Sequence, residues 1–214
     1  MTTPDPFASD RGRMLSEHLA ARGIHCPRVL SAMGQVPRHE FVLKGQQHLA
    51  YQDQALGIDC EQTVSQPYIV AAMSQALELS SDYHVLEIGT GSGYQAAILA
   101  ELSSRVISIE RHRPLYEAAG ERLARLGYEN IELLFGDGSQ GHAAAAPYQR
   151  IMITAAGREL PNAIWEQLVE GGILVAPLGG EGVQQLTRIV KRQGQPVSEV
   201  LMDCRFVPLV TDAP

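Results

Sequence analysis

The sequence has few cysteines, no metal-binding histidine pattern and no long apolar run. Its three cysteines, Cys26, Cys60 and Cys204, form no CxxC pair, which argues against a disulfide framework or a zinc site. No histidine falls in an HExxH pattern, so no metal is expected. No stretch approaches the roughly 20 apolar residues of a membrane helix, and the first residues lack the order of a secretory signal. We therefore expect a cytoplasmic protein that does not associate with membranes.

Basic residues are also in short supply. Lys and Arg number 17 against 24 Asp and Glu, for a formal net charge of −7. A composition that is 45% hydrophobic and 19% charged is typical of globular proteins. An acidic balance argues against a protein that binds the phosphate backbone, and the dense run Arg111–Arg113 is typical of a solvated helix entrance. We expect a monomer with no nucleic-acid partner.

The chain from about residue 81 onward alternates short apolar runs with helical patterns. Such alternation predicts βαβ units and an α/β fold with a doubly wound, mostly parallel, Rossmann-like sheet. Two final runs predict antiparallel strands at the carboxyl end. The expected strands cover 85–88, 105–109, 131–135, 150–154, 173–177, 186–190 and 199–207, and the expected helices cover 94–102, 114–126 and 161–168.

The first 80 residues have a different pattern. Apolar spacing predicts a helix over 9–23, a short helix opened by Pro27 and a helix from Pro67 to Leu79, with a loop over 36–61. We expect one domain over 1–214, in which 1–80 form a helical segment on the substrate side and 81–214 form the cofactor-binding core.

A glycine-dense turn follows the first strand of this core. Gly89, Gly91 and Gly93 lie between that strand and a helix, with Thr90 among them and Glu87 two residues before. Glycines there let a ligand approach the backbone, and the helix N-terminus favours an anionic group. The spacing departs from the dinucleotide pattern GxGxxG and is similar to the first motif of class I methyltransferases. S-adenosyl-L-methionine, their cofactor, also carries cationic groups that suit an acid such as Glu87.

Two further acids follow the next two strands. Glu110 closes the second strand, where an acid accepts hydrogen bonds from ribose hydroxyls. Asp137, followed by Gly138, comes after the third strand, where it can accept from an adenine amine. Either acid alone is more often a helix cap, but acids on successive strand ends beside a glycine loop predict a nucleoside site.

The methyl acceptor is harder to predict because the fold hosts many substrates. The segment 154–157 after the fourth strand reads Thr-Ala-Ala-Gly, without the acid or amide that enzymes methylating exocyclic amines carry. A carboxylate acceptor needs no base, since it is ionised at neutral pH. Hydroxyls suffice to hold it, and Thr63 and Ser65 supply two just before the helix at Pro67. Plain helix capping by Ser65 is the alternative, and it is favoured on spacing alone.

Several motifs in order along the chain resemble the protein-L-isoaspartate O-methyltransferase family. They are QTVSQPYIVA at 62–71, VLEIGTGSGYQAAILA at 85–100, GDG at 136–138, Leu160-Pro161 and RFVPL at 205–209. The resemblance implies methyl transfer to the free α-carboxylate of L-isoaspartyl residues in damaged proteins and peptides, with S-adenosyl-L-homocysteine as the second product. The ester then closes to a succinimide, which restores some normal linkage. The resemblance also makes Ser65 the active-site residue, with Thr63 beside it.

Two positions depart from the family pattern and concern substrate preference. Glu61 stands where the family usually has glycine, and His142 where it commonly has tryptophan. Other hypotheses remain open: a methyltransferase acting on another carboxylic acid or on RNA, or a protein that binds the nucleoside without turnover. A dehydrogenase is the least favoured of these.

Overall fold

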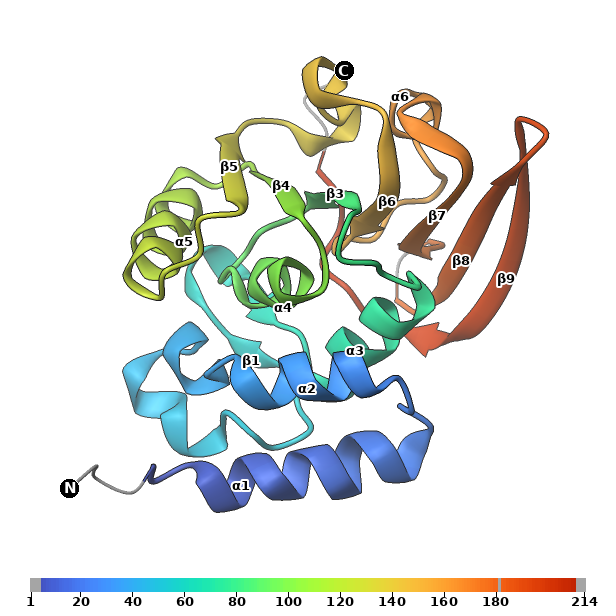
Figure 1. Cartoon of the computed structure of the whole chain (residues 1–214). Helices are drawn as coiled ribbons and strands as arrows, with labels where there is room; N and C mark the ends of the chain where they lie inside the picture. Colours follow the sequence, from blue (N-terminus) through green and yellow to red (C-terminus); the bar gives the residue numbers. More distant parts are fainter. Residues whose placement is uncertain (1–4, 181, 211–214) are drawn as a thin grey trace.

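The computed structural model describes residues 5–180 and 182–210, and its centre is a seven-stranded sheet in the order β5-β4-β3-β6-β7-β8-β9 (Figure 1). The strands β3 to β7 run parallel, whereas β8 and β9 are antiparallel additions at one edge. Their bounds are β3 His84–Ile88, β4 Arg105–Glu110, β5 Ile131–Phe135, β6 Tyr148–Ile153, β7 Leu168–Leu178, β8 Gln184–Arg192 and β9 Gln195–Cys204. The expected fold class is confirmed.

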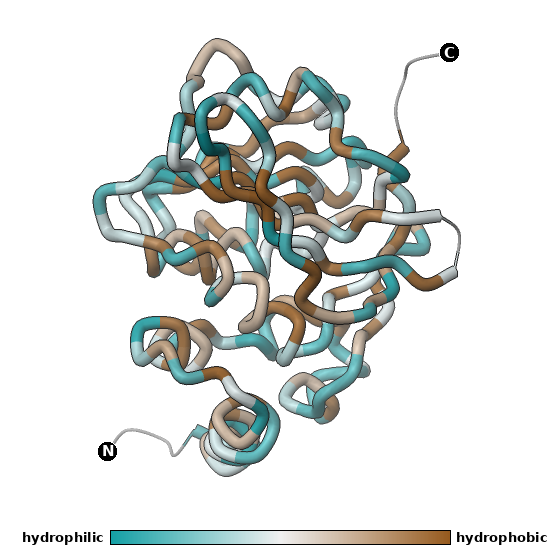
Figure 2. The backbone as a smooth tube through the Cα atoms, turned by 90° about the vertical axis from the view of Figure 1, so that its right-hand side faces the viewer, coloured by the Kyte–Doolittle hydropathy of each residue, from teal (hydrophilic) through white to brown (hydrophobic). Residues whose placement is uncertain are grey.

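Helices cover both faces of the sheet, because successive strand residues point to opposite sides. On one face Val85 packs with Leu99 of α4 (Tyr94–Leu102) and Met73 of α3 (Pro67–Ala76). On the other face the next residue of β3, Leu86, packs in the cluster that includes α6 (Asn162–Glu166). The helix α5 (Arg113–Arg125) connects β4 to β5. The central strands are the brown segments within the tube in Figure 2, as apolar strands buried on both faces require.

The strand order places a ligand crevice at the centre of the sheet. The chain leaves β3 for β4 and β5 on one side, and later returns to β6 on the other side of β3. In open α/β sheets, ligands bind beyond the carboxyl ends of the strands at such a reversal. The turn between β3 and α4 and the segment after β6 therefore face the same crevice.

The N-terminal segment lies below the sheet in Figure 1 and packs against α4. The predicted helix over 9–23 consists of α1 (Ala8–Arg13), a π-helical turn Met14–Leu19 and a 3₁₀ turn Ala20–Arg22. It ends at Gly23, whose φ is +93°. The predicted helix at Pro27 is α2 (Pro27–Gln35), and one apolar core joins the π-helical turn, α2 and their neighbours to Tyr94, Ile98 and Leu102 of α4.

The loop expected over 36–61 is more ordered than its sequence indicates. It contains the 3₁₀ turns Arg38–Phe41 and Lys44–Leu49 and the strand β1 (Leu56–Gly57), which pairs antiparallel with β2 (Thr63–Val64). Its elements are too short to produce a hydrophobic period, so the expectation of a plain loop is wrong here.

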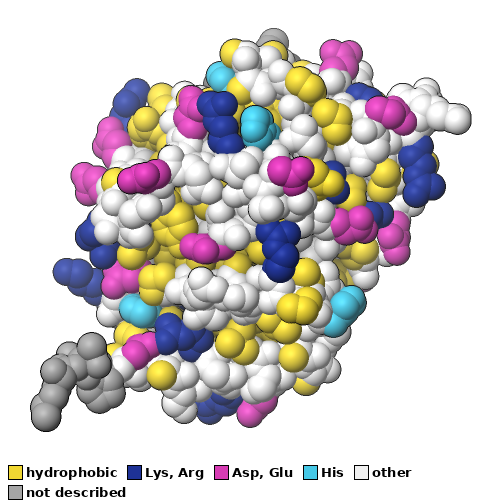
Figure 3. Space-filling view, viewed as in Figure 1, with side chains coloured by type: hydrophobic (Ala, Val, Ile, Leu, Met, Phe, Trp, Pro, Cys, Tyr) yellow, Lys and Arg dark blue, Asp and Glu magenta, His cyan; other side chains and the backbone are white. Residues whose placement is uncertain are grey.

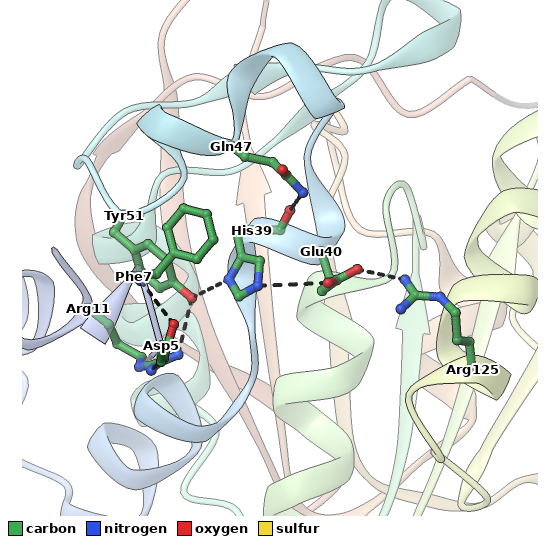
Figure 4. A network of polar contacts seen from close by, with 8 residues as sticks. All are labelled: Asp5, Phe7, Arg11, His39, Glu40, Gln47, Tyr51 and Arg125. Atoms are coloured by element: carbon green, nitrogen blue, oxygen red, sulfur yellow. Dashed lines mark hydrogen bonds and ion pairs between the residues drawn. The ribbon is translucent and has the colours of Figure 1, made fainter. Parts of the chain in front are cut away.

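A polar network fixes this segment to the rest of the chain (Figure 4). The His39 ring stacks on Phe7 with centroids 4.1 Å apart, and its Nδ1 lies 2.9 Å from the Tyr51 hydroxyl. The neighbouring Glu40 accepts from Arg125 of α5 at 2.7 Å. The first described residues, the 3₁₀ turns and the sheet core are thereby linked.

Two further corrections concern the carboxyl half. The helix expected over 161–168 spans only Asn162–Glu166, because β7 begins already at Leu168. The strand β8 is longer than expected, and β9 begins before residue 199 and ends at Cys204, so the strand expected to reach residue 207 is wrong at its carboxyl end; the two strands join through Gln193 and Gly194, both at positive φ. Such a two-residue turn matches the twist of a hairpin and lets pairing extend to its end.

The turn between β1 and β2 contains two strained residues. Cys60 and Glu61 have φ values of +59° and +58°, in the left-handed region that disfavours side chains with a Cβ. The glycine usual for the family at position 61 suits this backbone. In this chain a glutamate occupies it, exposed and beside the crevice.

We predict that Glu61→Gly stabilises the protein by about 1 kcal/mol in urea unfolding, because relief of the left-handed strain exceeds the added chain entropy. Glu121→Gly, at an exposed position inside α5, is the matched control and should lose about 1 kcal/mol. Equal losses in the two variants would contradict the prediction.

Candidate active site

A cavity of about 260 Å³ lies in the crevice beyond the carboxyl ends of β3, β4 and β6. Segments far apart in the sequence line it: 60–65 from the hairpin turn and β2, 88–92 from the glycine loop, 109–112 after β4, 154–155 after β6 and 207–210 near the carboxyl end. Most of the predicted site residues are therefore brought together in one place.

The glycine loop approaches its neighbours too closely for larger residues. Gly89 has φ +96°, and a Cβ there would lie 2.4 Å from Oγ1 of Thr154. That Thr154 hydroxyl donates to the carbonyl oxygens of Ile88 at 2.9 Å and Gly89 at 2.6 Å. A Cβ on Gly91 would meet only Ile58, at 3.9 Å, so Gly91 borders open space. The loop thus combines a fixed wall at Gly89 with an accessible backbone at Gly91.

Gly93 has a different place from the one predicted. It does not line the cavity but begins α4 at φ +88°, packed against Leu123 and Ala119 of α5. The next residue, Tyr94, is buried in the N-terminal core, where desolvation raises the pKa of its hydroxyl to about 12. The pattern GxGxGY therefore ends in an anchor that joins the loop to the first third of the chain.

Glu110 lies in the cavity wall, as predicted, and is almost fully buried. One carboxylate oxygen accepts from the amide of Gly91 and the other from the amide of His112, both at 2.8 Å. These bonds hold the carboxylate in place beside the glycine loop. Its predicted contact with ribose hydroxyls is compatible with this position, because each carboxylate oxygen can accept a second hydrogen bond.

Asp137 and Gly138 lie next to one another at the start of a 3₁₀ turn (Gly138–Gln140). Gly138 lines the cavity, and a Cβ on it would lie 2.5 Å from Ile88. The Asp137 carboxylate accepts from the amide and hydroxyl of Ser139, each at 2.9 Å, and the side chain is not part of the cavity wall. Its role at the adenine stays a prediction.

Glu87 is completely buried below the glycine loop and does not line the cavity, so its predicted contact with the cofactor stays a prediction. It accepts from the Ser108 hydroxyl, whose oxygen lies 2.6 Å from Oγ1 of Thr90. Its other oxygen has no partner in the described part of the chain. Desolvation, together with the charge of Glu110, raises the pKa of Glu87 to about 8, so Glu87 is protonated at neutral pH.

Thr63 and Ser65 contribute hydroxyls to the cavity wall. The capping alternative for Ser65 is wrong: the residue before α3 is Gln66, and the amide of Tyr68 donates instead to the Asp53 carboxylate at 2.9 Å. Neither the Thr63 nor the Ser65 hydroxyl bonds to any described residue. Both are therefore available to a ligand.

Arg38 is the residue that fixes Ser65, and the sequence did not single it out. The guanidinium is fully buried, donating to the carbonyl oxygens of Ala50 at 2.6 Å and Ser65 at 2.8 Å. It lies over the Tyr94 ring, 4.7 Å from the centroid. Burial lowers the pKa of Arg38, and one of its nitrogens, Nη1, has no partner in residues 5–180 and 182–210. A buried cation here connects the acceptor side of the crevice to the residue after the glycine loop.

The segment 207–210 closes the cavity on the side of β6. Ala156 donates to the carbonyl of Val207 and accepts from the amide of Leu209, each at 2.7 Å, while Arg111 donates to the carbonyl of Val210 at 2.6 Å. The RFVPL motif contains part of this segment but indicated no position in space. Its place, and those of Arg111 and His112 in the cavity wall, could not be predicted from the sequence.

No group of three or more His, Cys, Asp or Glu side chains suited to a metal ion occurs among the described residues. His142, at the other departure from the family pattern, is not in the cavity wall. None of the described helices is long and apolar enough to cross a membrane.

Known proteins are similar to this chain in both sequence and fold. The family model for protein-L-isoaspartate(D-aspartate) O-methyltransferase matches residues 10–213. A protein-L-isoaspartate O-methyltransferase of Methanoculleus marisnigri is 48% identical over 96% of this chain and 94% of its own. One solved protein-L-isoaspartate O-methyltransferase has TM-score 0.84 at 29% identity, over 92% of this chain and 65% of the other. Another, from Plasmodium falciparum with S-adenosyl-L-homocysteine, has TM-score 0.80 at 26% identity, over 92% and 97%.

We predict that Arg38→Lys lowers the free energy of unfolding by about 2 kcal/mol, because Arg38 reaches the two carbonyl oxygens through separate nitrogens, Nε and Nη2, and the single nitrogen of lysine cannot occupy both places, which leaves one buried oxygen without a donor. The turnover number for methyl transfer should fall at least tenfold while cofactor affinity is kept, since Ser65 is displaced and the glycine loop is not. Turnover is measured well below both unfolding midpoints, and cofactor affinity by calorimetry.

Arg28→Lys is the matched control for that variant. Arg28 also donates to two carbonyl oxygens, of Leu79 at 2.7 Å and Leu102 at 2.8 Å, but lies away from the cavity. It should keep the wild-type turnover number. A similar fall in both variants would mean that Arg38 acts on stability alone.

We predict that Glu87 makes the folded protein less stable as the pH rises from 4.5 towards 8. The unfolded chain loses this proton near pH 4.5 while the folded chain keeps it to about 8, so in this range the unfolded state binds fewer protons. Relative to Glu87→Gln, wild-type stability should fall with a slope approaching about 1.4 kcal/mol per pH unit. Urea unfolding at several pH values measures this, with Glu199→Gln on the exposed side of β9 as the control. A difference that does not change with pH would mean that Glu87 is already ionised in the folded protein.

Proposed function

The chain belongs to the protein-L-isoaspartate O-methyltransferase family, and from this premise we propose which of its residues carry out the reaction. The enzyme transfers a methyl group from S-adenosyl-L-methionine to the free α-carboxylate of L-isoaspartyl residues in damaged proteins. The ester then closes to a succinimide, which begins repair. The observation that supports our assignment is that Thr63 and Ser65 line the cavity and that their hydroxyls have no hydrogen-bond partner in residues 5–180 and 182–210.

The residues around the cavity suit S-adenosyl-L-methionine, which supplies an electrophilic methyl group on a sulfonium. We propose that Gly89, Thr90 and Gly91 form its backbone wall, Glu110 accepts from the ribose hydroxyls, and Asp137 with Gly138 lies at the adenine. Open space at Gly91 and a fixed carboxylate at Glu110 support this. For Glu87 and Gly93 we propose indirect roles, through Ser108 and Thr90 for Glu87 and through the start of α4 for Gly93.

On the acceptor side we propose that Ser65, with Thr63 beside it, donates hydrogen bonds to the substrate carboxylate. No general base is required, because an α-carboxyl has a pKa of about 3.3–3.7 and is already ionised at neutral pH. The protein's contribution is therefore alignment and removal of water, which can supply roughly 7–11 kcal/mol of the barrier. Arg38 holds the Ser65 backbone, and the segment 207–210 covers the cavity.

We also propose that the enzyme is a single-domain, cytoplasmic monomer whose acceptors are proteins and peptides and not nucleic acids. One apolar core shared by the N-terminal segment and α4 supports a single domain. The net charge of −7, and the acidic and basic side chains interspersed over the face in Figure 3, support a protein acceptor. Light scattering after gel filtration tests the monomer.

We predict that Ser65→Ala lowers the turnover number about 10- to 100-fold, because the hydroxyl aligns the attacking carboxylate with the methyl group, and the hydrogen bond that does so contributes about 1.5–3 kcal/mol. Cofactor affinity, measured by calorimetry, should change less than twofold. Ser198→Ala, on an exposed part of β9, is the control and should keep full activity. A loss of cofactor affinity would instead place Ser65 on the cofactor side.

The acceptor itself is tested with two peptides that differ only in their isoaspartyl or aspartyl linkage. With radiolabelled S-adenosyl-L-methionine, the isoaspartyl peptide should give a base-labile methyl ester and the aspartyl peptide almost none. Equal labelling of both, or a base-stable product, would contradict the proposed acceptor.

A further inference from the structure

A second, smaller pocket of about 60 Å³ adjoins the active-site cavity. Both spaces are lined by Thr63, Ser65, Thr154 and Val207. The two spaces therefore meet at Thr63 and Ser65, the residues proposed to bind the substrate carboxylate. The glycine loop and Glu110 line only the larger cavity, whereas Arg205 lines only the smaller one. The smaller pocket therefore adjoins the larger cavity at Thr63 and Ser65 but is not lined by the glycine loop or Glu110.

Arg205 provides a positive charge in this pocket. Its side chain is exposed, and its backbone is held by the neighbouring residues: Cys204 pairs with Gln184 at the end of β9, and the amide of Phe206 donates to the side chain of Gln184 at 3.0 Å. Within the described residues, three arginines bind neither a carboxylate nor a carbonyl oxygen: Arg158, Arg192 and Arg205. Of these three, only Arg205 lines either pocket.

Arg205 forms no ion pair with any described acid, including Asp203 two residues before it. Asp53 is paired with Arg22 and accepts from the Tyr68 amide, and Glu110 accepts from two backbone amides of the larger cavity. Glu61 lines the larger cavity and not the pocket that contains Arg205. An anion that enters the smaller pocket therefore meets three residues, Arg205, Thr63 and Ser65, whose side chains have no hydrogen-bond partner in the described part of the chain.

We infer that Arg205 is the substrate-binding cation of this enzyme, and that it attracts the isoaspartyl α-carboxylate through the oxygen that does not attack. This inference rests on the proposed function. A guanidinium is the side chain best suited to a planar carboxylate. The hydroxyls of Ser65 and Thr63 orient the group, and Arg205 supplies the attraction.

The charge change in the reaction determines which kinetic constant Arg205 affects. One carboxylate oxygen forms the bond to the methyl carbon, the bond from that carbon to sulfur breaks, and its electron pair remains on sulfur. The carboxylate becomes a neutral ester, the sulfonium a neutral thioether, and no proton moves. The attraction to Arg205 is therefore strongest in the ground state and weakens towards the product. Such an interaction lowers KM without raising kcat. Because it weakens when the neutral ester forms, it does not hold back the product.

The test is steady-state methyl transfer to an isoaspartyl peptide at saturating S-adenosyl-L-methionine. Arg205→Gln should raise KM for the peptide about five- to tenfold, as expected for a partly exposed charge-assisted bond, and change kcat less than twofold. Arg205→Lys should give an intermediate KM. Wild-type KM should rise with salt, and this dependence should be smaller in Arg205→Gln.

Arg192→Gln is the matched control, because it removes the same charge at the opposite end of the β8–β9 ladder, roughly 26 Å away. It should keep the wild-type KM. An isoaspartyl peptide whose α-carboxylate is replaced by a carboxamide separates charge from shape: as an inhibitor it should bind wild type and Arg205→Gln equally. Circular dichroism and the unfolding midpoint confirm that both variants fold.

Equal KM values for Arg205→Gln and Arg192→Gln would overturn the inference, as would a fall in kcat at unchanged KM. Tighter binding of the carboxamide to wild type than to Arg205→Gln would show that Arg205 recognises something other than the carboxylate. Failure of wild type to methylate the isoaspartyl peptide would instead overturn the proposed function before any variant is compared.

Discussion

A single buried guanidinium, that of Arg38, determines where Ser65, the residue proposed to bind the substrate carboxylate, lies relative to the glycine loop. It bonds the carbonyl oxygens of Ala50 and Ser65 and lies over the ring of Tyr94, the residue that follows the glycine loop. A fully buried cation without a salt bridge in the described chain is costly, and removing one of its partners leaves an uncompensated charge. This cost gives the surrounding backbone little freedom to rearrange. The geometry of Ser65 is thus set by the N-terminal segment, although the hydroxyl serves the crevice of the sheet.

The cofactor side also depends on a buried ionisable side chain, but this side chain is neutral. Glu87 is as deeply buried as Arg38, but it avoids the cost of a buried charge by keeping its proton. Its link through Ser108 to Thr90 stiffens the loop from below, while Glu110 holds the Gly91 amide from the side. The two acids therefore differ in charge because their surroundings differ. The position of Glu87, two residues before the glycine loop, did not show whether it contacts the cofactor directly or supports the loop from below.

The sequence predicted the parts of the molecule whose structure depends on interactions between residues close together in the chain. Strands, glycine turn and helix from Val85 to Leu102 follow from period and composition, and so do the acids at the strand ends. Spacing favoured Ser65 as a helix cap, but the amide in question bonds to Asp53, a residue distant in the sequence. The β1–β2 pair, the buried Arg38 and the cover formed by 207–210 were missed for the same reason. Each depends on contacts between segments that no local pattern connects.

This division has a chemical basis. A nucleoside cofactor with fixed dimensions can be held by one βαβ turn and two neighbouring strand ends, so its site can be written in contiguous motifs. The acceptor is a residue within a protein chain and needs an open space, and the space proposed for it is enclosed jointly by β2 and the segments after β6 and β9. The reaction removes one charge on each side: the positive charge of the sulfonium and the negative charge of the carboxylate. Groups on the acceptor side that bind the anion therefore lose their hold once the ester forms, whereas the cofactor side keeps its contacts with the nucleoside. An enzyme that acts on chance damage in many proteins benefits from this asymmetry, because attraction to a carboxylate brings the substrate in and its neutralisation lets the product leave.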